Sequence, residues 1–426
     1  MPPIVPQPAT DRAWSIEDAE RWLLSLERFG MTFGLGRMRR LMTALGSPQE
    51  RLRAVHVVGS NGKSSTVRMI AAIIAGHGLH TGAYLSPHLV SFAERVRVDG
   101  VDVAPERFAG AVRRAARAAA AVNRTLPAGE VVTQFEAITA AAYDELARQG
   151  VDVAVVEAGL GGRYDATSVI ASEVQVLTSV SLEHTHLLGP TIADIAAEKL
   201  DVVRPGATLV VGPTLHPDAL AVAERVCAAR EARLVHAPAG PPVELPGAPP
   251  YQRRNFALAC AAAGELLGRL DDDALTTAAA SATLVPGRFE VVDERPVTIF
   301  DGAHNVDGVR ALAEALRGFL AGRRLVACVA VLDDKDAVEM LRELLGLCAE
   351  LIFTSLRNPR ALPAATLESL ARQLSGPSVH VIADPHEALA AARAAAGEDG
   401  VALATGSLYL LAELLRGPDA PRGSML

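Results

Sequence analysis

The sequence lacks the features of membrane-spanning and exported proteins. No run of apolar residues approaches the roughly 20 that are needed to cross a bilayer. The proline-rich start MPPIVPQPAT does not have the charged-then-apolar order of a signal peptide. The few cysteines are widely separated and have neither metal-ligand nor disulfide-framework spacing; they are Cys227, Cys260, Cys328 and Cys348. We therefore expect a cytoplasmic protein with reduced, buried thiols and no membrane partner.

Excess positive charge is also missing. The 41 lysines and arginines are outnumbered by 49 aspartates and glutamates, which gives a formal net charge of −8. Because the basic residues are scattered as well, a nucleic-acid partner is not expected, although a local anion site remains compatible with this charge. Only 4% of the residues are aromatic, but 50% are apolar, so the chain has ample material for buried cores.

Two α/β domains account best for the length of 426 residues. Short β-branched runs alternate with long Ala- and Leu-rich stretches, which is typical of parallel strands joined by helices. The strands expected first are Ala54–Val58, Val151–Glu157, Val174–Val180 and Thr208–Val211. After a Pro- and Gly-rich stretch, strands are expected at Val297–Phe300, Leu325–Val331, Leu351–Thr354, Val379–Ile382 and Val401–Ala404. We predict a doubly wound, mostly parallel sheet domain over residues 1–290 and a smaller, Rossmann-like α/β domain over residues 291–426.

A glycine loop between a strand and a helix is the clearest local motif. The run AVHVV leads directly into GSNGKSST and then into a helical stretch. Such a loop presents backbone N–H groups and the positive end of a helix dipole to phosphate oxygens. Its glycines permit the tight turn, and Lys63 supplies a charge for the outer phosphates. The residues predicted to hold a nucleotide here are Gly59, Ser60, Asn61, Gly62, Lys63, Ser64 and Ser65.

Further motifs follow in a fixed order from about Trp22 to Leu414: LSPHL, QFEAITAAAY, VVEAGLGGRYDAT, SLEHTHLLGP, LVPGRFE, FDGAHN, VLDDKD and ATGSLYL. With the glycine loop, they make the chain resemble the folylpolyglutamate synthase/dihydrofolate synthase family of the Mur ligase superfamily. This resemblance implies a P-loop ATPase domain followed by a glutamate-ligase domain. It also implies an ATP-dependent carboxylate–amine ligase that activates folate or dihydropteroate as an acyl phosphate and couples it to L-glutamate. ATP and two Mg²⁺ ions are the expected cofactors, and we expect a monomer.

The resemblance implies that Ser86, Glu157 and His184 are metal ligands. Glu157 ends a predicted strand and precedes glycines, which is where doubly wound sheets place ligands, although a capping or salt-bridge role is the alternative. His184 alone would be interpreted as a packing residue. Lys199 resembles a family lysine that can be carbamylated to bind a second Mg²⁺; otherwise it would be a surface lysine. The predicted catalytic residues are Lys63, Glu157, His184, Lys199 and His304.

The resemblance also places Asn255, Arg288 and Asp301 around the nucleotide. An asparagine can contact an adenine edge, an arginine can neutralise phosphate, and an aspartate can accept hydrogen bonds from ribose hydroxyls. His304 follows the predicted strand that ends near Asp301, and we assign it to the phosphate or glutamate side of the site. Local hydrogen bonding within its loop is the alternative.

The chain departs from the family pattern at two informative positions. Ser64 stands where the family commonly has glycine, so either Ser64 or Ser65 could approach Mg²⁺. Gly36, in FGMTFGLGRM, replaces a glutamate close to where the pterin would lie, which leaves dihydropteroate, reduced folate or both open as acceptors. A ligase for a non-folate carboxylate and a non-catalytic nucleotide-binding protein are the competing hypotheses. The second is disfavoured because Lys63, Glu157 and His184 are all present.

Overall fold

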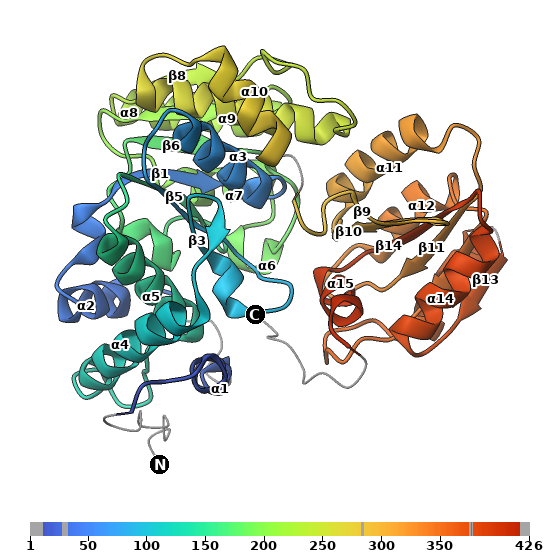
Figure 1. Cartoon of the computed structure of the whole chain (residues 1–426), viewed down its shortest axis with the longest axis horizontal. Coiled ribbons are helices and arrows are strands. Elements are labelled where there is room, and N and C mark those ends of the chain that lie inside the picture. Colours follow the sequence, from blue (N-terminus) through green and yellow to red (C-terminus); the bar gives the residue numbers. More distant parts are fainter. Residues whose placement is uncertain (1–11, 28–32, 283–284, 375, 377, 418–426) are drawn as a thin grey trace. The chain divides into compact units, whose positions relative to one another are not determined.

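The computed structural model describes residues 12–27, 33–282, 285–374, 376 and 378–417. Contacts within the chain divide the described residues into two compact units, one of residues 12–246 and 252–282 and the other of residues 247–251 and 285–417. The division expected from the sequence lies after residue 290. Each unit has its own sheet with helices around it (Figure 1). The α/β prediction is confirmed for both.

The first unit contains an eight-stranded sheet in the order β4-β3-β2-β5-β1-β6-β7-β8. Its strands are β1 (Arg53–Val58), β2 (Thr81–Tyr84), β3 (Val96–Val98), β4 (Val101–Asp102), β5 (Val153–Glu157), β6 (Val174–Leu177), β7 (Thr208–Val211) and β8 (Arg233–His236). All neighbouring strands are parallel except β2–β3 and β3–β4. Because β1 pairs with both β5 and β6, the carboxyl ends of these three strands meet in the middle of one sheet edge.

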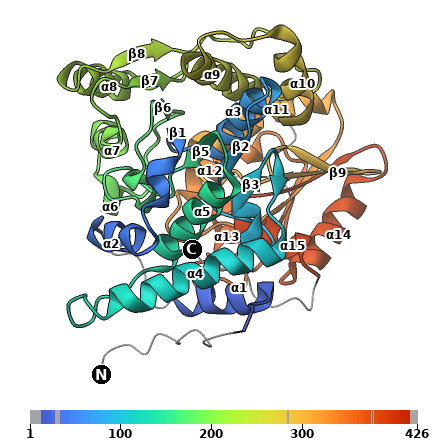
Figure 2. The ribbon, with the colours of Figure 1, turned by 60° about the vertical axis from the view of Figure 1, so that its left-hand side comes forward.

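Helices cover this sheet, as a second view shows (Figure 2). They are α1 (Ile16–Ser25), α2 (Gly36–Ala44), α3 (Lys63–Gly76), α4 (Pro105–Asn123), α5 (Gln134–Gln149), α6 (Thr185–Leu188), α7 (Ile192–Leu200), α8 (Pro217–Ala229), α9 (Pro250–Leu267) and α10 (Asp272–Ala282), with short 3₁₀ turns η2 (Pro48–Arg51), η3 (Phe92–Arg95) and η4 (Ala166–Val169). The first turn of α5 is fixed by a capping box, in which Thr133 and Glu136 satisfy each other's backbone N–H groups. The helices α1, α4 and α5 pack on one another and share one apolar core.

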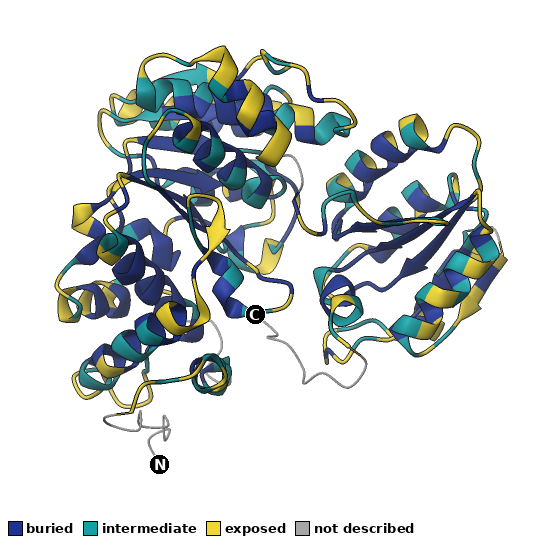
Figure 3. Cartoon of the chain, in the orientation of Figure 1, coloured by how far each residue is buried: buried dark blue, intermediate teal, exposed yellow. Residues whose placement is uncertain are grey.

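The second unit has a six-stranded sheet in the order β13-β12-β11-β14-β10-β9. Its strands are β9 (Glu290–Glu294), β10 (Val297–Asp301), β11 (Leu325–Val329), β12 (Glu350–Phe353), β13 (Ser378–Val381) and β14 (Val401–Thr405). Its helices are α11 (Val306–Leu320), α12 (Ala337–Leu345), α13 (Ala364–Gln373), α14 (Pro385–Ala396) and α15 (Leu408–Leu415). Only β9 runs antiparallel to its neighbour. Figure 3 shows that the central strands of each sheet are buried, whereas helices expose one face.

The predicted strands are present, but β2, β3, β4, β8 and β9 were not predicted. The strands β3 and β4 have three and two residues, too few for an alternating pattern to be recognised. The edge strands β8 and β9 are largely exposed and carry charged residues, so they lack an apolar face. Among the described residues, no helix combines the length and the apolar character needed to cross a membrane.

Candidate active site

The glycine loop lies between the end of β1 and the start of α3. Gly62 occupies the N-cap of α3 with φ 87°, and Gly59 has φ 146°. Both values fall in the region that favours glycine. A Cβ atom on Gly59 would lie 2.0 Å from Thr178 Oγ1, and one on Gly62 would lie 2.6 Å from Asn255 Oδ1. The loop therefore needs glycine at both positions, for backbone conformation and for space.

The segment after β6 holds the loop in place. The backbone nitrogen of Ser60 donates to Ser179 O at 2.8 Å, and that of Asn61 donates to Ser179 Oγ at 3.0 Å. Thr178 Oγ1 donates to Asn61 O at 2.7 Å, while the backbone nitrogen of Ser181 donates to Ser60 Oγ at 3.0 Å. The segment that follows β6 thus fixes the shape of the loop, and none of these hydrogen bonds involves Lys63.

We expect Gly59→Ala to weaken nucleotide binding about 10- to 100-fold, because the methyl group would displace Thr178 and the backbone would be strained by about 1–3 kcal/mol. The measurement is a titration of the purified protein with a fluorescent ADP analogue. Gly78→Ala is the matched control: Gly78 follows α3, has φ 83° and has no atom within 4 Å of an added Cβ. The control should lose stability but keep its nucleotide affinity; equal affinity in both variants would contradict the role of the Gly59 contact.

A buried carboxylate lies beside the first turn of α3. Glu157, the last residue of β5, is 1% exposed. Its Oε1 accepts a hydrogen bond from Ser64 Oγ at 2.9 Å, and its Oε2 accepts one from the backbone nitrogen of Ser86 at 3.1 Å. Of the two candidate serines, Ser64 therefore faces Glu157, whereas Ser65 is buried on α3. The Ser86 hydroxyl forms no hydrogen bond with any described residue.

A hard divalent cation would fit this group of oxygen atoms. Ser64 and Ser86 both contact this carboxylate, and each carries a hydroxyl oxygen of its own. Carboxylate and hydroxyl oxygens are the ligands that Mg²⁺ prefers. Within the described parts of the chain, no group of three or more His, Cys, Asp and Glu side chains could hold a metal ion, so a site here would depend on hydroxyl groups as well.

A buried ion pair lies beneath the glycine loop. Lys199, on α7, is 2% exposed and donates to Gly59 O at 3.1 Å and to Glu183 Oε1 at 3.3 Å. Burial lowers the pKa of Lys199 to about 8, although the Glu183 carboxylate opposes this shift. Burial acts to raise the pKa of Glu183, but the ammonium groups of Lys199 and Lys63 bring it down to about 2. Glu183 was not predicted from the sequence as a site residue. Its position beside His184 is the only feature of the sequence that could have indicated it.

Lys63 and His184 complete the loop region. Lys63 Nζ donates to Gly59 O at 2.9 Å and to Ser60 O at 3.2 Å, so its ammonium lies over the glycine loop. His184 caps α6 in a left-handed conformation with φ 48°. The hydrogen bond from Ser181 to Ser60 ties the segment that carries Glu183 and His184 to the loop. The structure thus brings Lys63, Lys199 and Glu183 together at the carbonyl of Gly59.

Asn255 lies on α9 against the glycine loop, as the short distance to Gly62 shows. Its Nδ2 donates to Gln252 Oε1 at 3.0 Å. Gln252 is fully buried, and its own Nε2 has no hydrogen-bond partner among the described residues. Gln252 was missed in the sequence, where its position three residues before Asn255 on a helix is the only indication that the two side chains meet.

The other predicted residues lie in the second unit. Asp301, 3% exposed at the end of β10, accepts hydrogen bonds from Tyr251 Oη at 2.8 Å and from the backbone nitrogens of Phe289 and Ala303, each at 2.9 Å. Burial raises the pKa of Asp301, and the Arg288 guanidinium opposes this shift. Asp301 is therefore already well supplied with donors, and Tyr251 is a partner that the sequence did not reveal.

Arg288 and His304 lie around the loop that follows β10. Arg288 Nη1 donates to Gly287 O at 3.0 Å and is 3.0 Å from the position of a Cβ atom on Gly302. His304 Nδ1 is 2.8 Å from Gly302 O, which is the local loop contact named as the alternative for this histidine.

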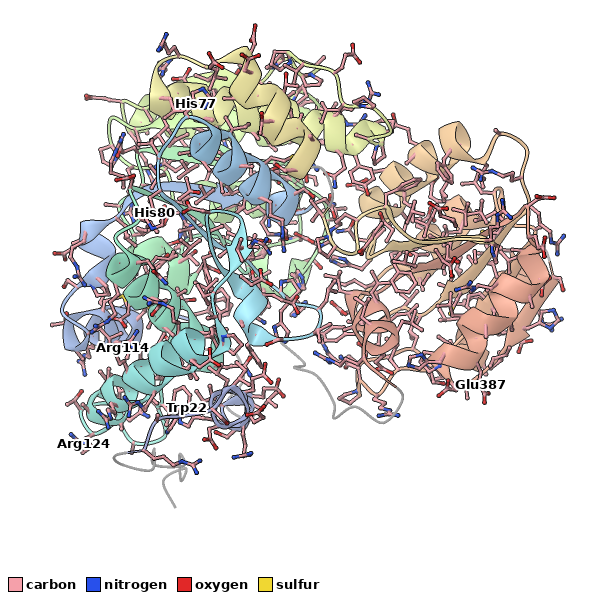
Figure 4. All side chains as sticks on the ribbon, in the orientation of Figure 1. Trp22, His77, His80, Arg114, Arg124 and Glu387 are labelled. Carbon is pink, nitrogen blue, oxygen red and sulfur yellow. The ribbon has the colours of Figure 1, made fainter. Side chains whose placement is uncertain are left out.

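Three histidines outside these motifs make structural contacts. His77, labelled in Figure 4, caps the far end of α3, where its Nδ1 is 2.7 Å from Ile73 O and its Nε2 accepts from the backbone nitrogen of Asp271 at 2.9 Å. His80, also labelled there, pairs with Asp99 at 2.7 Å. His56 is buried, and its Nε2 lies 2.8 Å from Thr167 Oγ1. Burial lowers the pKa of His56 to about 3, so its ring is neutral.

Comparisons with known proteins identify relatives of this chain. Residues 287–408 match the glutamate ligase domain of Mur ligases. The dihydrofolate synthase/folylpolyglutamate synthase of Bacillus subtilis (strain 168) is 33% identical, over 93% of this chain and 98% of that protein. A structure of Mycobacterium tuberculosis folylpolyglutamate synthase complexed with ADP superposes with a TM-score of 0.87 at 30% identity, covering 94% of this chain and 97% of the other. A bifunctional folylpolyglutamate synthase/dihydrofolate synthase with Mn, AMPPNP and L-glutamate bound gives a TM-score of 0.83 at 28% identity, covering 95% and 99%.

Proposed function

Because the chain belongs to the folylpolyglutamate synthase/dihydrofolate synthase family of Mur ligases, we propose that it adds L-glutamate to the carboxylate of a folate or dihydropteroate. The chain is thus an ATP-dependent ligase. One observation supports placing this activity at the glycine loop. A glycine-lysine loop, a helix N-terminus and a strand-end glutamate meet at one edge of the sheet. That convergence is what an enzyme needs to hold a triphosphate and its cation.

The reaction needs ATP because a carboxylate has a poor leaving group and does not react with an amine at neutral pH. Transfer of the terminal phosphoryl group to the acceptor carboxylate gives an acyl phosphate, which the glutamate amine then attacks with release of phosphate. Lys63 and the backbone N–H groups of the glycine loop would stabilise the charge on the transferring phosphoryl group. At present Lys63 Nζ donates to two loop carbonyls, so phosphate oxygens would replace these acceptors.

Mg²⁺ would neutralise phosphate charge and orient the terminal phosphate. We propose that Ser86, Glu157 and His184 hold it, with Ser64 supporting Glu157. Three features support this set: the buried Glu157 carboxylate, the Ser86 hydroxyl without a hydrogen bond to the described residues, and the attachment of the His184 segment to the loop. A related structure contains Mn with AMPPNP; the identity and number of ions in this chain are part of the proposal.

Carbamylation of Lys199 remains part of the proposed mechanism. Only the neutral amine can attack CO₂, and a pKa of about 8 leaves about a tenth of the amine neutral at pH 7. The buried position under Gly59 would protect a carbamate from exchange with solvent. Carbamylation would turn the cationic partner of Glu183 into an anion. A bound cation would then balance the negative charges of the carbamate and of Glu183.

We propose that the second unit supplies Arg288, Asp301 and His304 to the nucleotide and the incoming glutamate. Its match to the glutamate ligase domain over residues 287–408 includes all three positions. Asn255 in the first unit would contact the nucleotide from beside Gly62. The cytoplasmic location and the monomeric state expected from the sequence stay predictions.

The function is tested by measuring ADP release from purified protein, Mg²⁺ and ATP with dihydropteroate, tetrahydrofolate or neither, each with and without L-glutamate. We expect release to require glutamate together with at least one of the two pterins. The pattern of stimulation also decides between dihydrofolate synthase activity, folylpolyglutamate synthase activity and both. Glutamate-dependent release that neither pterin stimulates would support the ligase for a non-folate carboxylate instead.

A further inference from the structure

Arg68 lies on the side of α3 that faces Glu157. It follows Ser64 by four residues, so the two side chains share one helix face. Ser64 Oγ is 2.9 Å from Glu157 Oε1, which fixes the direction of that face. Long side chains on a helix extend toward its N-terminus, and this directs the Arg68 guanidinium back toward the turn that contains Ser64. Arg68 is not part of any motif described above.

This arginine has no hydrogen-bond or ion-pair partner in the described part of the chain, although it is partly buried. The neighbouring cations are all paired: Lys63 with the carbonyls of Gly59 and Ser60, Lys199 with Glu183, and Arg97 with Asp102. A guanidinium has five N–H donors. Arg68 therefore presents a set of donors to which no described residue supplies an acceptor.

Arg68 lies among several charged groups. Burial lowers the pKa of Arg68 to about 10; the charge of Arg97 adds to the shift, and the carboxylates of Asp102, Glu157 and Glu94 oppose it. Because Arg68 is only partly buried, water can reach its donors in the free protein. An anionic ligand beside Glu157 would replace that water with charge-assisted hydrogen bonds.

We propose that Arg68 binds the carboxylate end of the pterin-bearing acceptor and holds it beside Glu157. This inference rests on the proposed function, because it takes the acceptor to be a folate or dihydropteroate. A carboxylate is favoured over a phosphate of ATP because the loop amides and Lys63 already serve the phosphates at the start of α3. Arg68 lies one helical turn further along, on the Glu157 side. The planar fork of a guanidinium also matches a carboxylate with two parallel hydrogen bonds.

The direct test measures binding of dihydropteroate and of tetrahydrofolate to the ADP-bound protein by calorimetry. Arg68→Met removes the charge and keeps the length of the side chain, while Arg68→Lys keeps the charge and loses the fork. We expect Arg68→Met to weaken acceptor binding about 10- to 100-fold, as loss of a charged hydrogen-bonding group does, with Arg68→Lys between it and the wild type. The affinity for ADP should not change.

Arg53→Met is the matched control. Arg53 begins β1, so it lies at the opposite end of that strand from the glycine loop, and its exposed side chain pairs with Glu173. This variant removes the same charge from the same unit and should bind the acceptor normally. A third arm uses an acceptor whose carboxylate is replaced by a carboxamide: the wild type should discriminate against it, and Arg68→Met should bind the two compounds equally.

Stability separates binding from a structural role. Because Arg68 has no partner to lose among the described residues, Arg68→Met should unfold at the same temperature as the wild type or higher. Unchanged acceptor affinity in Arg68→Met would overturn the inference, as would weaker ADP binding with normal acceptor binding, which would place Arg68 on a phosphate. If the wild type itself binds neither pterin, the proposed function fails, and this result is distinct from failure of the Arg68 assignment.

Discussion

Glu157→Gln should lower the rate of ADP formation about a thousandfold while leaving the fold intact. The glutamine has the same shape, and its amide can preserve both local contacts: the oxygen can accept from the backbone nitrogen of Ser86, and the nitrogen can donate to Ser64, whose hydroxyl can turn to accept. Only the negative charge is removed. The loss of activity would then result from weaker cation binding and slower phosphoryl transfer, and not from disruption of the site.

Single-turnover ADP formation with saturating acceptor measures this effect, and titration of the nucleotide-bound protein with Mn²⁺ measures the cation affinity separately. Both should fall in Glu157→Gln. Glu173→Gln is the control, since Glu173 is half-exposed and pairs with Arg53 on the surface. A Glu157→Gln protein that keeps normal Mn²⁺ affinity and more than a small part of its activity would rule out Glu157 as a metal ligand.

Lys199→Met should abolish activity and also destabilise the protein by about 3–5 kcal/mol, because it leaves Glu183 buried without its main counter-charge. These two effects have different origins. The activity depends on a group at Lys199 that can bind a cation, whereas the stability depends on charge balance beneath Gly59. A single substitution cannot separate them.

The double variant Lys199→Met with Glu183→Gln separates the two effects. It removes both charges of the buried pair, so most of the lost stability should return in urea unfolding experiments, while activity should stay absent. Carbamylation is examined directly by ¹³C NMR with labelled bicarbonate, which should give a carbamate resonance in the wild type that is missing in Lys199→Met. Recovery of activity in the double variant would show that the role of Lys199 is structural only.

Sequence patterns were sufficient wherever function depends on residues that are neighbours along the chain. The glycine loop, its lysine and the helix that follows are contiguous, and the strand that ends at Glu157 is an apolar run of the expected length. These features depend on local backbone preferences and on burial, both of which can be recognised in a single stretch. The motifs also predicted the family, which the comparisons confirm.

Partners that are distant in sequence were not predictable in the same way. Glu183 was noticed only as a neighbour of His184, and Tyr251 and Gln252 were missed, although they contact Asp301 and Asn255. Which of Ser64 and Ser65 approaches Mg²⁺ was left open by the sequence, and the contact of Ser64 with Glu157 could not be predicted from it. The direction of each side chain on α3 became known only when β5 was placed beside that helix.

The sequence by itself determined that this protein has two α/β units, a phosphate-binding loop and the residue types of a Mur-type ligase. The tertiary structure decided which hydroxyl supports Glu157 and which acid neutralises Lys199, and it leaves the partly buried Arg68 without a partner among the described residues. The reason is physical. Local sequence sets the conformation of a segment, whereas the pairing and desolvation of a charge depend on which segments the sheet order brings together.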